Sequence, residues 1–292
     1  MGFQDVSVGM CKAGLRQVAH MQDIFEELRD MRYLNWTKTR KSSGTAGSFL
    51  KAYDDTGIVR RYYKLSDYVT GRGIDGHECI NEIIVQRLMR VLDIDHLEYR
   101  LLHATVVVDD AEYETWLCES DDFKNQGESK IALEDFFAAQ RLAGETPLDM
   151  CIRMGWESTI YNMLILDYLI LNRDRHGANI EVLRSKKNRN YRLAPLFDHG
   201  LCLMCQSRSE AEFKSFDVMD DKRVQAFIGT NSTKDNLSLI PKDYIREFVS
   251  SHEITEELRK MLCNKISDIM PLVFCEKTWE MISGRWKYLE SI

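Results

Sequence analysis

An eight-residue box in the middle of the chain constrains the fold most. It reads Asn-Arg-Asp-Arg-His-Gly-Ala-Asn over residues 172–179, directly after the apolar segment 160–171, and Phe-Asp-His-Gly follows at 197–200. An Asp with an Asn five positions later, and then a second Asp before a short loop, is the spacing that phosphoryl-transfer enzymes use to place a base and two metal ligands. The spacing predicts an ATP-dependent kinase.

Composition and length are consistent with a globular protein. The 292 residues, 44% of them hydrophobic, suffice for one large domain or two lobes. No apolar run approaches the roughly 18 residues that span a bilayer, and the first residues lack a basic segment leading into an apolar one. We therefore expect a cytoplasmic protein without a membrane partner.

The eight cysteines are scattered through apolar segments, which indicates reduced thiols and no disulfide framework. Cys202 and Cys205 form a single Cys-x-x-Cys close to His199. A structural zinc site needs four ligands, and no second pair with suitable spacing exists. Zinc is therefore the weaker interpretation.

The net charge of −7 argues against direct nucleic-acid binding, which usually uses a basic stripe. Basic residues nevertheless outnumber acidic ones between positions 38 and 64, whereas acidic residues dominate from 109 to 134. A local positive patch suits a phosphate-rich small ligand. The alternative is an ordinary solvated surface, and charge alone does not choose between them.

Hydrophobic periodicity predicts a change of structure along the first half. Ile24, Leu28, Met31 and Leu34 have helical spacing, so the first 35 residues are expected to be helix-rich. The expected elements after them are a β-hairpin over 48–65, an amphipathic helix over 77–92, strands over 98–108 and 114–118, and a polar break over 119–122.

The second half is predicted to be mostly helical. Helices are expected over 133–142 and 160–171, a second hairpin over 179–197 with Asn179 and Asp198 at its ends, and at least three helices from 242 onward, with Trp279 and Trp286 in the core. The prediction is an α+β, two-lobed protein-kinase-like fold, with a β-rich N-terminal lobe (1–119) and a helical C-terminal lobe (120–292).

Phosphoryl transfer requires mainly positioning and charge neutralisation. A loop of small residues can bring backbone N–H groups close to phosphates. The candidates are Ser42, Ser43, Gly44, Thr45, Ala46 and Gly47. A simple turn is the alternative for this loop.

After this loop, a phosphoryl-transfer site needs a lysine for the phosphates and an acid that orients the lysine. Lys64 on the following strand would hold the phosphates, although it could also protect a sheet edge. Glu78 and Glu82 share one face of the next helix, and we prefer Glu82 as the partner of Lys64 because its apolar neighbours suggest burial.

The box over 172–179, together with Asp198, supplies the predicted base and metal ligands. Asp174 would orient the attacking hydroxyl and accept its proton, and His176 would hold the backbone of the loop. Asn179 and Asp198 would bind Mg²⁺ through oxygen atoms. Glu119, at the lobe boundary, completes the set expected to contact the nucleotide.

Taken in order, these segments resemble the HipA-like serine/threonine kinases, in particular the short CtkA-like members. The segments are 40–47, 63–66, 76–82, 167–179 and 193–198, and the resemblance runs from about residue 38 to residue 230. The Asp-x-His-x-x-Asn spacing of residues 174–179 is its most specific part.

The resemblance implies a kinase that uses ATP and Mg²⁺ to phosphorylate a protein on Ser or Thr. It also implies a possible role as the toxin of a toxin–antitoxin pair, with an antitoxin as partner, and autophosphorylation at Ser42, Ser43 or Thr45. His199 replaces the Phe that follows the metal-binding Asp in many kinases, so a switch built on that Phe is not expected here.

Two other classes remain open. Phosphoinositide kinases carry a similar box, so a lipid or small-molecule kinase is the first alternative. A nucleotide-binding pseudokinase or interaction module is the second. It predicts the loss of at least one of Lys64, Asp174, Asn179 and Asp198, yet all four are present.

Overall fold

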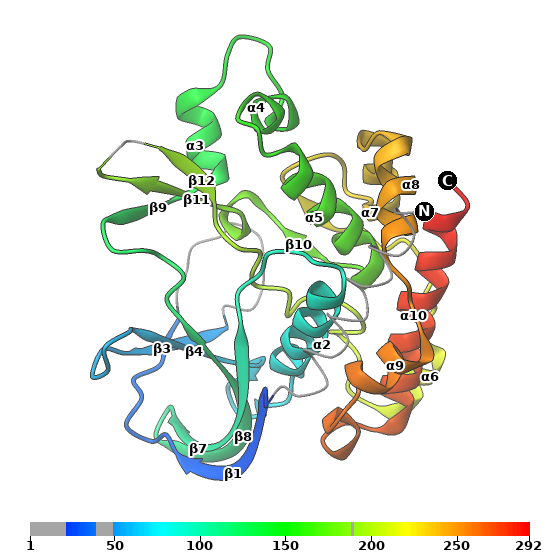
Figure 1. The fold of residues 1–292 in the computed structure, drawn as a ribbon. Helices are drawn as coiled ribbons and strands as arrows, with labels where there is room; N and C mark the ends of the chain where they lie inside the picture. Colours follow the sequence, from blue (N-terminus) through cyan, green and yellow to red (C-terminus); the bar gives the residue numbers. More distant parts are fainter. Residues whose placement is uncertain (1–21, 39–48, 188–189) are drawn as a thin grey trace.

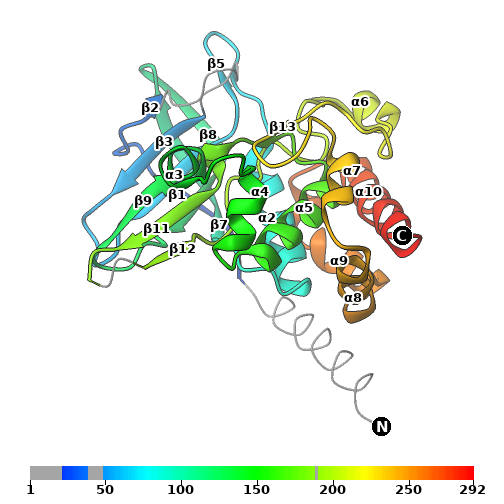
Figure 2. The same cartoon turned by 90° about the horizontal axis from the view of Figure 1, so that it is seen from above.

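The computed structural model describes residues 22–38, 49–187 and 190–292. Most of the β-structure lies in the first part of the chain, and most of the helices lie in the second (Figure 1). Figure 2 shows the sheet on one side of the molecule and the C-terminal helices on the other. The predicted α+β, two-lobed architecture is confirmed.

A six-stranded sheet forms the N-terminal lobe, in the order β1-β7-β8-β4-β3-β2. Strand β1 runs parallel to β7, and all other neighbours are antiparallel. The strands are β1 (Ile24–Asp30), β2 (Thr37–Lys38), β3 (Leu50–Asp54), β4 (Arg61–Leu65), β7 (Tyr99–Val108) and β8 (Ala111–Asp121), and a small hairpin adds β5 (Tyr68–Val69) and β6 (Gly73–Ile74). The predicted hairpin over 48–65 is therefore confirmed as β3 and β4.

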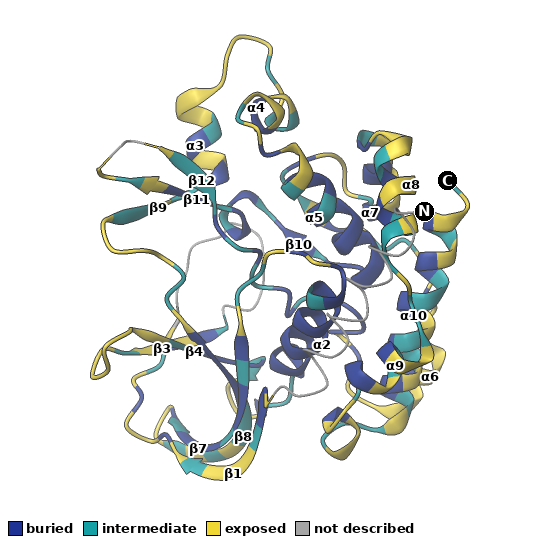
Figure 3. Cartoon of the chain, in the orientation of Figure 1, coloured by how far each residue is buried: buried dark blue, intermediate teal, exposed yellow. Residues whose placement is uncertain are grey.

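Helix α2 (Glu78–Val91) joins the two lobes. It packs on β7 and β8 and also contacts α9 (Glu256–Leu262). Every residue of α2 except Arg90 is buried, and the helix is dark over almost its whole length in Figure 3. The predicted helix over 77–92 is confirmed, and because it is enclosed on both sides it fixes the polar side chains that it carries.

The helix expected near residue 24 is wrong, because residues 24–30 form β1. Ile24, Met31 and Leu34 are buried as their spacing suggested, but Leu28 is exposed. The parallel ladder with β7 satisfies the backbone of this segment and overrides its local helical periodicity. Residues 1–21 lie outside the described part of the chain.

The polar break expected at 119–122 is also misplaced, since β8 continues to Asp121. Glu119 and Ser120 are buried within the strand, and the Glu119 carboxylate accepts a 2.5 Å hydrogen bond from Nε of Arg100. Pairing of β8 with both β4 and β7 keeps these polar residues in the sheet. The division into lobes at residue 119 stays a prediction.

The C-terminal part is built around the buried helix α5 (Glu157–Ile170), which contacts α10 (Leu272–Glu290). The predicted hairpin is confirmed as β11 (Glu181–Ser185) and β12 (Tyr191–Leu193), and β9 (Glu128–Ala132) adds a third strand. The other helices are α3 (Leu133–Gln140), α4 (Pro147–Arg153), α6 (Glu210–Ser215), α7 (Thr233–Asn236) and α8 (Lys242–Ser251).

Three predicted C-terminal helices are confirmed as α8, α9 and α10. Trp286 is buried, whereas Trp279 is half-buried and packs against the core. Within the described ranges, no helix combines the length and apolarity needed to cross a membrane.

Candidate active site

Lys64, Glu82 and Asp198 meet in the interior between the two lobes. Nζ of Lys64 lies 3.0 Å from Oε1 of Glu82 and also donates to Oδ1 of Asp198. Strand β4, helix α2 and the loop after β12 supply one residue each. The side chains of Lys64 and Glu82 are 8% and 0% exposed, so this ion pair is shielded from solvent.

Glu82 also fixes the loop that carries Asp198. Its carboxylate accepts hydrogen bonds of 2.9 Å from the N–H of His199 and 3.0 Å from that of Gly200. The sequence left two glutamates as partners of Lys64, and the structure pairs Lys64 with Glu82. Glu78 instead accepts from the N–H of Asp67 and lies 3.5 Å from Arg208.

The cluster holds its groups in their charged forms. Burial opposes the charge of Lys64, but the carboxylates of Asp198 and Glu82 raise the pKa of Lys64 well above its usual value. Burial likewise opposes ionisation of Asp198, but Lys51 and Lys64 hold the pKa of Asp198 well below its usual range. Asp198 is therefore an ionised carboxylate suited to a hard cation.

The eight-residue box over 172–179 begins just after α5 ends at Ile170. Leu171 takes a left-handed conformation with φ of 50°, which stops the helix and turns the chain outward. Within the box, two residues form the short strand β10 (Asp174–Arg175), which pairs in parallel with β13 (Gln225–Ala226). A 3₁₀ turn over Gly177–Asn179 follows. The loop is thus anchored at both ends by regular structure.

Arg175 ties this loop to its surroundings. Its buried guanidinium donates to Asp167 of α5 at 2.9 to 3.3 Å, and to the carbonyls of Asn179 and Phe197 at 3.2 Å each. It therefore holds the backbone next to both predicted metal ligands. No role was predicted for Arg175 or Asp167, although an Asp within an apolar helix was the available signal.

Asp174 is 9% exposed, and among the described residues its Oδ1 has no hydrogen-bond partner. Burial raises the pKa of Asp174 above its usual value. Nε2 of His176 is 3.6 Å from Oδ1 of Asp174, and Nδ1 of His176 accepts from the N–H of Ala178. His176 thus contacts the backbone of the loop, the part of the loop that it was predicted to hold.

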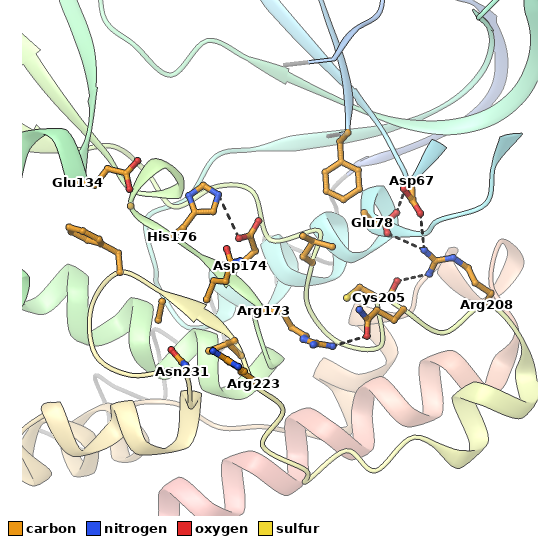
Figure 4. A pocket seen from close by; sticks show the side chains of 18 residues that line it. Asp67, Glu78, Glu134, Arg173, Asp174, His176, Cys205, Arg208, Arg223 and Asn231 are labelled. Carbon is orange, nitrogen blue, oxygen red and sulfur yellow. Dashed lines mark hydrogen bonds and ion pairs between the residues drawn. The ribbon is translucent and has the colours of Figure 1, made fainter. Parts of the chain in front are cut away.

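Asp174 faces a cavity of about 790 Å³ (Figure 4). Glu134, His176 and Phe49 also line it, and Nζ of Lys64 lies 4.8 Å from the centre of the Phe49 ring. Phe49 thus separates the cavity from Lys64, and the ring contacts both. The size of the cavity is typical of a site for a small molecule or a short peptide segment.

Asn179 and Asp198 have the donor chemistry of a magnesium site. Nδ2 of Asn179 donates to the carbonyl of Asp174 at 2.8 Å, which directs the amide oxygen away from that bond. Together with the ionised Asp198 this gives two oxygen donors, as Mg²⁺ prefers when phosphates and water complete its shell. These residues fit a magnesium–nucleotide complex.

Two further predictions for the nucleotide site concern the loop 42–47 and Glu119. Residues 42–47 of the small-residue loop lie outside the described part of the chain. The Glu119 carboxylate accepts a hydrogen bond from Arg100 and lies 3.8 Å from Arg61, so this buried side chain pairs with two more exposed arginines. A role of Glu119 at the nucleotide stays a prediction.

The fold and this cluster define a protein-kinase-like protein. Solved structures that share the fold include those of CtkA and HipA. The Helicobacter pylori proinflammatory kinase CtkA has a TM-score of 0.60 and 14% identity, over 90% of this chain and 96% of that one. HipA of Shewanella oneidensis MR-1, solved with HipB and operator DNA, has a TM-score of 0.53 and 13% identity, over 97% of this chain and 71% of that one.

One curated relative is also similar in sequence. The serine/threonine-protein kinase CtkA of Helicobacter pylori (strain J99) is 40% identical over 47 residues, which is 16% of this chain and 14% of that protein's length. No family model matches the chain. The chain therefore shares its fold with CtkA and HipA.

Proposed function

We propose that this protein is an ATP- and Mg²⁺-dependent protein kinase that phosphorylates Ser or Thr. The observation that carries the proposal is the convergence of Lys64, Glu82 and Asp198 in one buried cluster. Asp174, which lines the cavity, is close enough to this cluster for the charges of Asp198 and Lys64 to act on its carboxyl group. A buried lysine paired with a helix glutamate and adjacent to an ionised Asp is the arrangement that protein kinases use to hold ATP and its metal. The CtkA-type fold supports the same class.

Each residue has a definite role in the proposed reaction. Lys64, oriented by Glu82, neutralises phosphate oxygens. The small-residue loop 42–47, which lies outside the described part of the chain, stays the predicted source of backbone N–H groups for the same phosphates. Asp198 and Asn179 hold Mg²⁺, which supplies positive charge to the transferring phosphoryl group when bound. Asp174 orients the acceptor hydroxyl and takes its proton, while His176 and Arg175 hold Asp174 and its loop in place.

The proposal extends to the biological setting of the HipA-like kinases. We infer a cytoplasmic enzyme that acts on a protein substrate and can modify its own loop at Ser42, Ser43 or Thr45. Association with an antitoxin is part of the proposal, because a neighbour of the same fold was solved with HipB. The net charge of −7 argues against direct nucleic-acid binding by this chain.

The test is transfer of label from γ-labelled ATP in the presence of Mg²⁺. A degenerate Ser/Thr peptide mixture and the protein itself serve as acceptors, and intact-mass measurement detects autophosphorylation. We expect Asp174→Ala and Asp198→Ala each to reduce labelling by about 100-fold or more. The first variant removes the positioned base, and the second removes the predicted carboxylate ligand of the metal. Asp268→Ala, at an exposed position on the far part of the C-terminal lobe, is the matched control.

Full activity in either active-site variant would contradict the assignment. Label found on phosphoinositide vesicles and not on protein would move the acceptor to the lipid class.

A further inference from the structure

A second lysine reaches the predicted metal-binding carboxylate. Lys51 on β3 lies directly opposite Lys64 on β4 in the antiparallel register. Nζ of Lys51 is 3.3 Å from Oδ2 of Asp198, while Lys64 donates to Oδ1 of the same side chain. Two ammonium groups thus occupy the two oxygens of one carboxylate.

The two lysines differ in how firmly they are held. The side chain of Lys64 is 8% exposed and has Glu82 as a second carboxylate partner. The side chain of Lys51 is 45% exposed, and within the described ranges it forms no ion pair other than that with Asp198. Lys51 can therefore leave Asp198 by rotation about its flexible stem, whereas Lys64 would lose a buried ion pair.

A divalent cation at Asp198 would compete with these ammonium groups for the carboxylate oxygens. A carboxylate oxygen that accepts from an ammonium cannot at the same time ligate a metal along the same lone pair, and two nearby cations repel each other. Lys51 is the group with the lower cost of displacement. The displaced ammonium group of Lys51 would remain close to Asp198, because its side chain is attached to β3. The phosphates that accompany the metal would need positive charge at this position.

We propose that Lys51 forms a second phosphate-binding position. It occupies Oδ2 of Asp198 when the metal site is empty, and it pairs with the phosphates of the nucleotide once a divalent cation takes that oxygen. This inference rests on the proposed kinase function. It assigns to Lys51 opposite effects on two ligands: the residue competes with the metal alone and assists the metal–nucleotide complex.

The experiment compares Lys51→Met, Lys51→Arg and the control Lys242→Met, which removes an exposed lysine from α8. Each purified protein, shown to be folded by circular dichroism, is titrated with fluorescent methylanthraniloyl-ATP plus Mg²⁺. Each is also titrated with Mn²⁺ alone, followed by the electron paramagnetic resonance signal of the free ion.

We expect Lys51→Met to bind the Mg²⁺ nucleotide about fivefold more weakly than wild type, and to bind Mn²⁺ alone a fewfold more tightly. Lys51→Arg should keep the nucleotide affinity within about twofold, because it keeps the charge, and Lys242→Met should match wild type in both titrations.

An unchanged nucleotide affinity in Lys51→Met, or an Mn²⁺ affinity that is equal to or weaker than that of wild type, would overturn the proposal and leave the kinase function intact. Such results would make the contact an ordinary exposed ion pair. Failure of wild type and Lys242→Met to bind the nucleotide would instead overturn the proposed function, and this inference with it.

Discussion

The carboxyl group of Asp174 is placed where its negative charge is unfavourable. It is buried, its Oδ1 lacks a hydrogen bond among the described residues, and burial raises its pKa. A carboxyl whose pKa is higher in the folded state stabilises the fold at low pH, and this contribution is lost as the pH rises through that pKa. At neutral pH the ionised Asp174 therefore costs stability, as expected of a residue kept for chemistry.

Asp174→Asn should consequently stabilise the protein while it abolishes phosphoryl transfer. We expect the free energy of unfolding at pH 7 to rise by about 1 kcal/mol, since the amide carries no charge to desolvate. The gain should disappear as the pH falls toward the raised pKa, because Asp174 is then protonated in the wild type. Thermal denaturation between pH 4 and pH 8 measures both effects, with Asp268→Asn as the control. A less stable variant at pH 7 would refute this account of Asp174.

Spacing along the chain was sufficient to predict some individual site residues. Residues whose contacts are long-range were not predicted. Asp174, Asn179 and Asp198 were predicted from their order and spacing along the chain, and their roles stay predictions. Lys51 and Arg175 were not singled out. The contacts of Lys51 with Asp198 and of Arg175 with Phe197 join residues that are far apart in sequence. No local pattern encodes such contacts.

Among the elements, helix α5 and the loop that carries Asp174 and Asn179 are joined by one buried ion pair. Arg175 and Asp167 are 2% and 7% exposed in their side chains, and Arg175 also bonds two loop carbonyls. Removal of one partner leaves the other as an uncompensated buried charge.

We therefore expect Arg175→Met to lower the free energy of unfolding by about 3 kcal/mol or more in urea denaturation. The double variant Arg175→Met with Asp167→Leu should recover part of that loss, because no charge is then left unpaired. The exposed pair between Arg246 and Asp243 is the control, and Arg246→Met should cost at most about 0.5 kcal/mol. Equal losses from Arg175→Met and Arg246→Met would show that the buried pair does not hold the loop.

Local periodicity predicted most elements correctly, including α2, α5 and both hairpins. The failures have one cause, since they involve pairing between distant segments. Strand β1 pairs in parallel with β7, and the end of β8 is kept in the sheet by β4 and β7. Burial of Glu119 beside Arg100 was likewise invisible to a reading of local polarity.

Across the whole molecule, the candidate site depends on the contact between the two lobes. Lys64 comes from the sheet, Glu82 from the helix that both lobes enclose, and Asp198 from the C-terminal part. A ligand that bridges these three groups should stabilise the folded protein by mass action, by about 2.7 kcal/mol at 100 times its Kd.

Thermal denaturation with ATP, in the presence and absence of Mg²⁺, tests this central claim most directly. We predict that ATP with Mg²⁺ raises the Tm by several degrees, and that Asp198→Asn loses the magnesium-dependent part of the gain. No change in Tm at millimolar ATP and Mg²⁺, with the protein shown to be folded, would contradict a nucleotide site at Lys64, Glu82 and Asp198.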